Sequence, residues 1–328
     1  MNNTQTNKIS ISNHLQEIGG NNIKEEIITG LVAKQKYISP KYFYDKKGSE
    51  LFEEITHLKE YYPTRTEKSI LSSLVKRLDI DFNNASIIEL GSGDPSKIII
   101  LLNQLSQQTL NTINYYPVDI SPSAVNESIS ILKEKYSLNN INGIIIDFMA
   151  QLNLIPKDNH RIFCFFGSTI GNFNRKERSI FIKLLSNEMQ AGDELILGLD
   201  MVKNTAILEN AYNDSQNITA DFNKNILSVV NKHISSDFNI KDFEHYAFFN
   251  TIESRIEMHL RALKNISISI DNYPSKIELI KGESIHTENS YKFTNKDIIQ
   301  FTVDTKLEIV NTLNDENKWF SIIHLKKK

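Results

Sequence analysis

The segment Ile87–Lys97, with the sequence IIELGSGDPSK, decides the fold that we expect for this chain. A short apolar run rich in isoleucine ends at Leu90, a turn with Gly91 and Gly93 follows, and a helical pattern of apolar residues begins after Pro95. Proline suits the first turn of a helix, because the N–H that it lacks has no partner there in any case. The segment therefore predicts a strand, a glycine turn and the N-terminus of a helix.

The glycine turn restricts the class of ligand that can bind there. Glycine has no Cβ, so a ligand can come close to the backbone, and the free N–H groups of a helix N-terminus attract negative groups. The turn lacks the third glycine of the dinucleotide motif G-x-G-x-x-G, and no G-K-[ST] sequence of a phosphate loop follows it. A nucleoside that carries a carboxylate, such as S-adenosylmethionine, fits this turn better than a pyrophosphate does. The alternative is an ordinary turn of an α/β protein that binds nothing.

Composition and charge exclude several classes of protein. With 328 residues, of which 40% are hydrophobic, the chain can bury a large core, and its net charge of −3 gives no reason to expect nucleic acid or an anionic membrane as a partner. No apolar run reaches the roughly 18–20 residues that span a bilayer, and the first residues, MNNTQTNKIS, contain no hydrophobic signal segment. Cys164 is the single cysteine, so intrachain disulfides are excluded, and we expect no metal site. We expect a cytoplasmic monomer with Cys164 in its core.

Strand and helix patterns alternate between residues 85 and 201, which predicts a parallel sheet with helices on both faces. The expected strands are Ser86–Leu90, Asn114–Ile120, Gly143–Ile146, Arg161–Phe166 and Glu194–Leu199. Ligands of open α/β sheets bind at the carboxyl ends of the strands. The residues that follow these ends form the candidate site: Gly91, Gly93, Asp119, Asp147 and Gly167.

Two aspartates in this set suit a nucleoside. Asp119 follows the second strand, where a carboxylate can accept hydrogen bonds from both ribose hydroxyls. Asp147 can accept a hydrogen bond from an adenine amino group, and the adjacent Phe148 offers an apolar face to the ring. The alternative for either aspartate is a turn or a helix cap.

An aromatic segment precedes this alternation. Residues 41–67 contain four tyrosines and two phenylalanines among many charges, so Tyr44 and Phe52 either line a pocket or pack over the neighbouring domain. The sequence Thr64-x-x-Glu67 has the form of a capping box, and we expect a helix to begin there.

Strand patterns return in the C-terminal third of the chain. Residues 256–262 alternate between apolar and polar types, with Met258 on the apolar face. The segment 286–293 places Glu288 and Ser290 on one side of another strand.

These patterns predict two domains. We assign residues 65–201 plus 292–328 to a nucleoside-binding domain and residues 15–64 plus 202–291 to a second domain. The polar residues 1–14 are expected to be frayed.

Several segments of the chain, in a fixed order, resemble a known family. They are YFYDKKGSELFEEIT, EYYPTRTE, ELGSG, GSTIGN, DMVK, AYND, TADFNKN, DFEHYAFFN, SRIEMHLRA and TENSYKF, and the resemblance extends over about residues 20–328. The family is that of the L-histidine N-alpha-methyltransferases of ergothioneine biosynthesis. So many ordered segments are far more specific than one glycine turn. Asp94-Pro95 departs from the family pattern, in which we expect small hydroxyl residues after GSG.

The resemblance implies a class I S-adenosylmethionine-dependent methyltransferase with a Rossmann-like sheet and a second, α+β substrate domain. The implied reaction is trimethylation of the α-amino group of L-histidine to hercynine. The resemblance implies that the cofactor contacts Tyr61, Gly91, Lys97, Asp119, Asp147 and Phe148. It implies that histidine places its carboxylate near Asn172 and Tyr212, its amine near Tyr44, Gly167 and Phe52, and its imidazole against Glu288, Ser290 and Met258.

The chemistry of these residue types agrees with the implied roles. Imidazole has a donor and an acceptor nitrogen, and a carboxylate with a hydroxyl two residues along one strand face supplies both partners. Methyl transfer mainly needs an amine lone pair aligned with the methyl carbon, so we expect Tyr44 and Asn172 to orient the amine without a strong general base. Two alternatives stay open. One is an N-methyltransferase for another amino acid such as tryptophan, whose indole has a donor and no acceptor, and the other is a non-catalytic protein that only binds the nucleoside.

Overall fold

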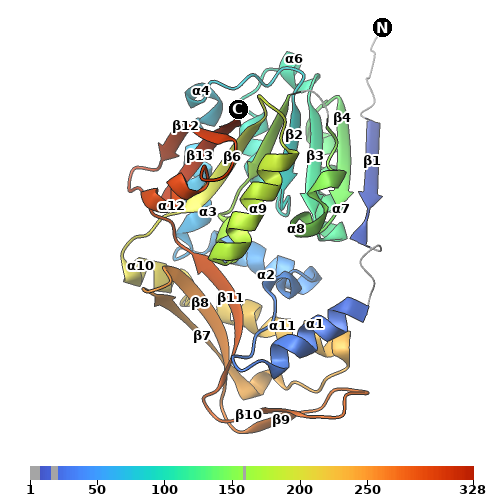
Figure 1. Cartoon of the computed structure of the whole chain (residues 1–328), viewed down its shortest axis with the longest axis vertical. Helices are drawn as coiled ribbons and strands as arrows, with labels where there is room; N and C mark the ends of the chain where they lie inside the picture. The colour runs from blue at the N-terminus through green and yellow to red at the C-terminus, as the bar shows by residue number, and fades with distance from the viewer. Residues whose placement is uncertain (1–7, 16–20, 158–159) are drawn as a thin grey trace. The chain divides into compact units, whose positions relative to one another are not determined.

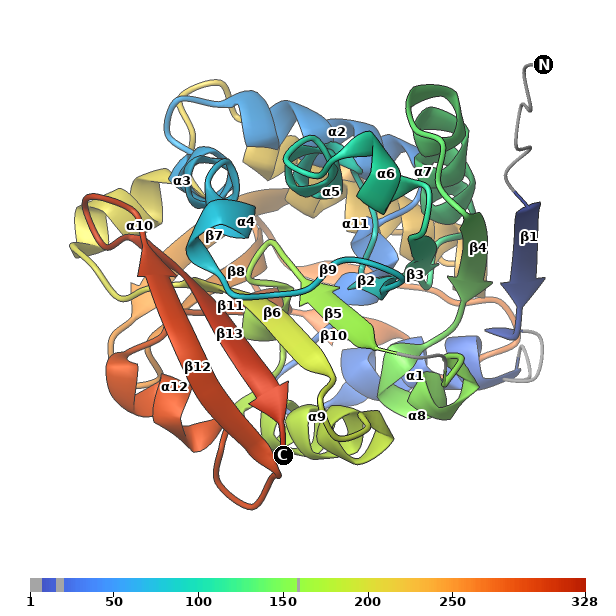
Figure 2. The same ribbon diagram turned by 90° about the horizontal axis from the view of Figure 1, so that it is seen from above.

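The predicted strand Ser86–Leu90 is β2, and it lies in the middle of an eight-stranded sheet (Figure 1 and Figure 2). The computed structural model describes residues 8–15, 21–157 and 160–328, which fall into two units. The first unit contains the sheet and consists of residues 8–15, 63–157, 160–202 and 293–328, and the second unit consists of residues 21–62 and 203–292. The predicted domain boundaries at 64/65, 201/202 and 291/292 differ from these by one or two residues.

The sheet of the first unit is mostly parallel. Its strands are β1 (Lys8–Asn13), β2, β3 (Asn114–Asp119), β4 (Asn140–Ile145), β5 (Arg161–Phe165), β6 (Glu194–Asp200), β12 (Leu307–Asn314) and β13 (Phe320–Lys327). Their order is β1-β4-β3-β2-β5-β6-β13-β12, and the pairs β6–β13 and β13–β12 are antiparallel while the others are parallel. The predicted parallel α/β sheet is therefore confirmed, and β13 and β12 extend it beyond β6.

Helices cover both faces of this sheet. They are α3 (Tyr62–Leu71), α4 (Leu74–Arg77), α5 (Ser96–Leu102), α6 (Gln107–Leu110), α7 (Pro122–Lys135), α8 (Phe148–Gln151), η3 (Leu152–Leu154), η4 (Thr169–Asn172), α9 (Arg175–Glu188) and α12 (Asn295–Gln300). Figure 2 shows α5, α6 and α7 on one face and α8 and α9 on the other. This layering confirms the class predicted from the alternation of strands and helices.

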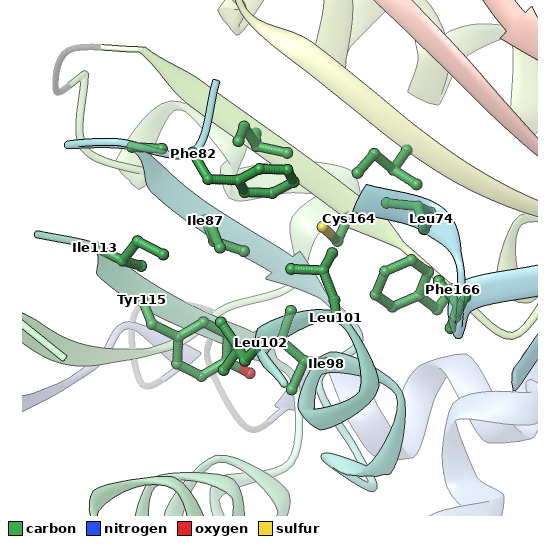
Figure 3. Packing of buried hydrophobic residues seen from close by; sticks show 14 of the residues in the cluster. Leu74, Phe82, Ile87, Ile98, Leu101, Leu102, Ile113, Tyr115, Cys164 and Phe166 are labelled. Carbon is green, nitrogen blue, oxygen red and sulfur yellow. The ribbon is translucent and has the colours of Figure 1, made fainter. Parts of the chain in front are cut away.

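The apolar side chains of β2 and α5 form the centre of a hydrophobic core. Ile87, Ile98 and Leu101 are fully buried and pack in one cluster with Cys164 (Figure 3). Burying a side chain of this size stabilises a fold by roughly 1.5–3 kcal/mol. Cys164 is a free, buried thiol, as expected, and burial raises its pKa.

The N-terminal segment corrects one prediction. Instead of being frayed, residues 8–13 form β1 and pair in parallel with β4 at the edge of the sheet. Ile9 and Ile11 are 45% and 43% exposed, so backbone hydrogen bonds rather than buried side chains hold this strand. Residues 1–7, which the same prediction covered, lie outside the described residues.

The predicted capping box at Thr64 and Glu67 is also wrong. Helix α3 already begins at Tyr62, so neither residue lies at its start. The Glu67 side chain is fully buried and bonds to Gly167 instead of to its own helix. A partner far away in the sequence has replaced the local one.

The second unit combines helices with a small antiparallel sheet. Its helices are α1 (Asn21–Val32), η2 (Pro40–Phe43), α2 (Lys46–His57), α10 (Thr205–Asn210), α11 (Ile218–Ile234) and η5 (Ile240–Asp242). Its strands are β7 (Phe243–Asn250), β8 (Arg255–Ala262), β9 (Ile266–Ile268), β10 (Ile277–Leu279) and β11 (Ser284–Tyr291), and the main sheet has the order β11-β8-β7. Helix α11 packs against α1 and α2 and against β7 and β8. The unit is therefore α+β, as predicted.

Candidate active site

The turn after β2 is open on one side. Gly91 has a φ of +70°, which favours glycine, and the N–H groups of Gly91 and Ser92 donate to the carbonyl of Val118 at 2.8 and 3.2 Å. A Cβ on Gly93 would meet only the carbonyl oxygen of Gly91, at 4.0 Å. Because no other described atom occupies this space, a ligand can lie directly against the backbone.

Asp119 holds the same turn from the end of β3. One oxygen of its carboxylate accepts a hydrogen bond from the N–H of Gly93 at 3.2 Å, and the other accepts one from Ser121 at 2.9 Å. Burial raises the pKa of Asp119, although these N–H groups counteract the rise. Each carboxylate oxygen has a second lone pair. Asp119 can therefore still accept hydrogen bonds from ligand hydroxyls, and the ribose contact stays a prediction.

The Asp94-Pro95 sequence forms the start of α5. The Asp94 carboxylate accepts hydrogen bonds from the N–H of Ser96, at 2.9 Å, and from the Ser96 hydroxyl, while Pro95 is the N-cap residue. A carboxylate at this position satisfies a free N–H group of the helix N-terminus. The departure from the family pattern therefore leaves the strand, turn and helix arrangement intact.

Glu67 connects three elements of the first unit. Its two carboxylate oxygens accept hydrogen bonds from the N–H of Gly167 at 2.8 and 3.0 Å, and Lys97 Nζ lies 2.9 Å from Glu67 Oε2. Two predicted site residues, Lys97 and Gly167, are thus brought together by a residue that was not among them. The signal available in the sequence was a charge on the apolar helix face that carries Ile70 and Leu71.

Asp147 and Phe148 follow β4 at the same edge of the sheet. The N–H of Ile146 donates to the carbonyl of Asp119 at 3.1 Å, so Asp147 comes directly after the residue that pairs with β3. Asp147 Oδ1 caps α8 by accepting from Met149 at 2.9 Å, so the helix-cap alternative describes one of its oxygens. The half-buried Phe148 ring packs edge-on against Phe165, with centroids 5.7 Å apart.

Asn172 ends the short helix η4 after β5. The preceding Ser168 has a φ of +55°, and its hydroxyl accepts a hydrogen bond from the N–H of Asp200 at 2.9 Å. Within the described residues the half-buried Asn172 amide has no hydrogen-bond partner. Its two donors and its acceptor are therefore available to a ligand.

The second unit contains a chain of aromatic rings. Tyr44 lies edge-on to Phe52 at 5.9 Å, Phe52 to Tyr61 at 6.3 Å, and Tyr61 to Tyr212 at 6.2 Å. Phe222 on α11 lies 6.1 Å from Tyr44 and 5.9 Å from Phe52. The structure therefore brings together four predicted site residues, together with Phe222, which the sequence analysis missed because it fits an ordinary apolar helix face.

Glu288 and Ser290 lie on one face of β11, next to β8. Glu288 is paired with Met258, which is 1% exposed, and Ser290 is paired with Ile256. Burial raises the pKa of Glu288 to about 7, and the charge of Lys292 counteracts this rise. Among the described residues the Glu288 side chain receives no hydrogen bond, so it can accept one from a ligand.

The hydroxyl of Ser290 belongs to a buried polar group. It lies 2.7 Å from Tyr212 Oη and 2.7 Å from Lys292 Nζ, and Lys292 Nζ also lies 3.1 Å from Tyr212 Oη. Lys292 was not predicted as a site residue. It belongs to the same TENSYKF segment, but a lysine at a strand end is usually a solvated charge.

A hydrogen-bond network connects Thr287 of β11 to the backbone of Tyr212. The Thr287 hydroxyl donates to Asn223 Oδ1 at 2.7 Å, and Asn223 Nδ2 lies 2.9 Å from Nδ1 of His245. His245 Nε2 lies 2.8 Å from the carbonyl oxygen of Tyr212, and burial lowers the His245 pKa. A neutral ring accepts at Nδ1 and donates at Nε2, so the network holds the Tyr212 backbone in place.

A second polar cluster lies on the opposite face of β8 and β11. Ligand atoms of Glu257, His259 and His286 lie within 4.8 Å of one another, and the two imidazole rings are stacked at 4.6 Å with an angle of 12° between their planes. An imidazole binds a metal in its ring plane, and nearly parallel stacked planes cannot share one ion. Despite burial, hydrogen bonds from Arg255, His259 and Asn250 lower the pKa of Glu257 to about 2. As it stands, the cluster is an ion-pair and stacking network.

The predicted site residues fall into two sets, one in each unit. The set in the first unit consists of Gly91, Lys97, Asp119, Asp147, Phe148, Gly167 and Asn172. The set in the second unit consists of Tyr44, Phe52, Tyr61, Tyr212, Met258, Glu288 and Ser290. Tyr61 was predicted to contact the cofactor, and it lies in the aromatic chain of the second unit.

None of the helices in the described part of the chain has both the length and the apolar character of a membrane span.

Comparison with known proteins identifies the family. Residues 23–327 match the family model of SAM-dependent, histidine-specific methyltransferases. The chain is 37% identical to a histidine N-alpha-methyltransferase of Mycobacterium tuberculosis, over 87% of this chain and 89% of that protein. It is 27% identical to ergothioneine biosynthesis protein 1 of Schizosaccharomyces pombe, over 82% of this chain and 36% of that protein. Among solved structures, a mitomycin 7-O-methyltransferase shares the fold with a TM-score of 0.50 and 9% identity, covering 96% of this chain and 70% of that one. The chain belongs to the family of S-adenosylmethionine-dependent histidine-specific methyltransferases.

Proposed function

We propose that this protein transfers methyl groups from S-adenosylmethionine to the α-amino nitrogen of L-histidine and forms hercynine, the trimethylated product, for ergothioneine biosynthesis. The observation that carries the proposal is the pair Glu288 and Ser290 on one face of β11. The pair offers one acceptor and one hydroxyl to a ring with two nitrogens, and none of the residues that the structure describes donates to the Glu288 carboxylate. Family membership supports the same substrate.

The first unit is suited to S-adenosylmethionine, which supplies an electrophilic methyl group on a sulfonium. The space beside Gly93 is open, and Ser92 Oγ is buried without a hydrogen-bond partner among the described residues. Asp119 can accept ribose hydroxyls, while Asp147 and Phe148 can bind the adenine. Lys97 and Tyr61 complete the proposed cofactor set.

The proposed histidine set divides its work between polar and aromatic groups. Glu288 accepts the imidazole N–H, Ser290 donates to the other ring nitrogen, and Met258 packs against the ring. Asn172 binds the carboxylate, which lies near Tyr212, and Gly167 lies near the amine. This arrangement leaves the amine to be oriented by separate groups.

Tyr44 and Asn172 orient the neutral amine, and solvent takes its proton. Alignment of the reacting atoms can supply roughly 7–11 kcal/mol in favourable cases. Each added methyl group increases the size of the cation, and the faces of Tyr44 and Phe52 can stabilise it by about 0.5–2 kcal/mol. The chain therefore acts mainly by positioning.

Mass spectrometry tests the reaction directly. The purified protein is incubated with S-adenosylmethionine and a mixture of the twenty amino acids. We expect histidine alone to gain three methyl groups, which the ring nitrogens by themselves cannot accept. Methylation of tryptophan or another amino acid would contradict the histidine assignment, and cofactor binding without any methylation would favour the non-catalytic alternative.

Substitution of Glu288 tests the histidine set. Glu288→Ala removes the acceptor for the imidazole N–H, and we expect the KM for histidine to rise by about 10- to 100-fold while the Kd for S-adenosylmethionine stays unchanged. Glu278→Ala, at an exposed position on β10, is the matched control. Unchanged histidine turnover in Glu288→Ala would refute the assignment.

The monomeric state and the cytoplasmic location stay predictions, and light scattering tests the monomeric state.

A further inference from the structure

We infer that Lys292 is a positioning residue that fixes the Ser290 hydroxyl as a hydrogen-bond donor, so that the site selects a ring with an acceptor nitrogen. The inference rests on the proposed function, because it takes Glu288 and Ser290 as the residues that bind the imidazole. It adds a residue outside the predicted set and states which of the two ring nitrogens that residue controls.

Lys292 is held in one place inside the second unit. It is 2% exposed, its backbone N–H donates to the carbonyl of Ser254 at 2.8 Å, and its Nζ lies 5.0 Å above the ring of Tyr212. An ammonium group has three donors and no acceptor. Both hydroxyl oxygens near Nζ, Ser290 Oγ at 2.7 Å and Tyr212 Oη at 3.1 Å, must therefore accept from it.

The contact between Tyr212 and Ser290 has a preferred direction. Their oxygens lie 2.7 Å apart, and a phenol is a stronger acid than an aliphatic alcohol, so Tyr212 donates and Ser290 accepts. Ser290 Oγ then accepts two hydrogen bonds, which fill its two lone pairs. No acceptor among the described residues takes the hydrogen of Ser290, so this hydrogen is left for a ligand.

Glu288 supplies the complementary group on the same strand face. When the Glu288 carboxylate is ionised, it can accept a hydrogen bond but cannot donate one. The Ser290 hydroxyl, which already accepts from Lys292 and Tyr212, can donate a hydrogen bond but cannot accept another. This pair matches a neutral imidazole, which has one N–H and one bare nitrogen. A pyrrole or an indole has the N–H alone and would leave the buried Ser290 donor without a partner, which costs free energy.

Histidine analogues separate the two halves of this pair. In β-(pyrrol-2-yl)alanine and β-(pyrrol-3-yl)alanine a C–H replaces one ring nitrogen and the N–H is kept. In β-(thiazol-4-yl)alanine the acceptor nitrogen is kept and sulfur replaces the N–H. The experiment compares kcat/KM for histidine with kcat/KM for each analogue at pH 9, in the wild type and in Lys292→Met.

We expect the wild type to prefer histidine over the better pyrrole by on the order of 10- to 100-fold. In Lys292→Met this preference should fall to within a few-fold, mainly through KM, while the preference over the thiazole stays the same. Lys292→Arg should restore the preference, because a guanidinium also donates to both hydroxyls. Lys327→Met, which alters another buried lysine, in the first unit, should leave both ratios unchanged.

A second substitution keeps the test decisive if Lys292→Met does not fold. Tyr212→Phe removes the other donor to Ser290 Oγ and should lower the preference over the pyrrole in the same way. An unchanged pyrrole ratio in a folded variant that still binds S-adenosylmethionine overturns this inference alone. Equal loss of both ratios together with loss of cofactor binding also overturns it, because it marks a general structural role. If the wild type does not methylate histidine, the proposed function fails and the inference fails with it.

Discussion

The carboxylate of Glu67 accepts hydrogen bonds from the N–H of Gly167, at 2.8 and 3.0 Å from its two oxygens. The same carboxylate pairs with Lys97 at 2.9 Å. One fully buried side chain on α3 thus ties the end of β5 to the first turn of α5. This contact lies at the carboxyl ends of the strands, where we propose that the cofactor binds.

Glu67→Gln should destabilise the protein and weaken the binding of S-adenosylmethionine. The amide keeps the shape but loses the charge that stabilises Lys97, and breaking a buried ion pair costs about 3–5 kcal/mol. Urea unfolding measures the stability, and calorimetric titration measures the affinity. The exposed Glu134→Gln is the control. Gly198→Ala should also destabilise the protein and weaken the binding of S-adenosylmethionine, because the added Cβ would lie 2.3 Å from Glu67 Oε1 and displace the carboxylate. A loss of stability below about 0.5 kcal/mol in Glu67→Gln would contradict this prediction.

The two glycines of the turn after β2 should respond differently to alanine. Gly91→Ala places a Cβ on a residue with a φ of +70°, which costs about 1–2 kcal/mol of stability. Gly93→Ala puts its methyl group into open space, so stability should change little while the Kd for S-adenosylmethionine rises at least about 10-fold. Thermal unfolding and calorimetric titration of both variants check this contrast. Undiminished cofactor affinity in Gly93→Ala would show that the ligand does not lie against this turn.

Phe222→Leu should raise the KM for histidine without changing the Kd for S-adenosylmethionine. Phe222 is 2% exposed and stacks on Phe43 at 4.5 Å, and its ring also contacts Tyr44 and Phe52. The smaller side chain should cost about 1–2 kcal/mol of stability, less than the roughly 3–5 kcal/mol of a change to alanine. Steady-state kinetics with histidine as the varied substrate measures the effect. Phe238→Leu, whose ring packs against Phe243, should lose similar stability and keep its KM.

Glu288→Gln should change how stability depends on pH in the absence of histidine. Burial raises the pKa of Glu288 from 4.5 to about 7, so between these pH values the native protein keeps a proton that the unfolded chain has lost. The free energy of unfolding therefore falls as the pH rises through this range. Since glutamine does not ionise, the variant should gain stability relative to the wild type by about 3 kcal/mol at most between pH 4.5 and pH 7. Urea unfolding at several pH values measures the difference, and a difference that stays constant would contradict the prediction.

The sequence predicted the central strands well, because these strands leave a strong local trace. All five residues of β2 are buried, and the predicted bounds Ser86–Leu90 are the observed ones. A strand covered on both faces appears as a continuous apolar run that ends at turn residues. The edge strand β1 has no such trace, since its isoleucines are exposed and only its backbone pairs.

The candidate site was predictable to the extent that it follows from strand periodicity and family motifs. Glu288 and Ser290 share a face because both follow the irregularity in register between His286 and Glu288, so the period of two holds between them. Lys292 and Phe222 were missed for a physical reason. A lysine at the end of a strand, such as Lys292, is usually explained by solvation, and an apolar residue on a helix face, such as Phe222, by core packing. Neither the spacing nor the type of these residues reveals what they contact.

The sequence by itself determined where the main strands and helices lie and which chemical groups end the strands, because both depend on local periodicity and on turn residues. Only the tertiary structure decided which buried charges meet. Glu67 contacts Gly167 and Lys97, and Lys292 contacts Tyr212. These partners lie far apart along the chain, so no periodic sequence pattern predicts the contacts. A buried charge is stable only beside suitable partners, and folding alone places those partners next to it.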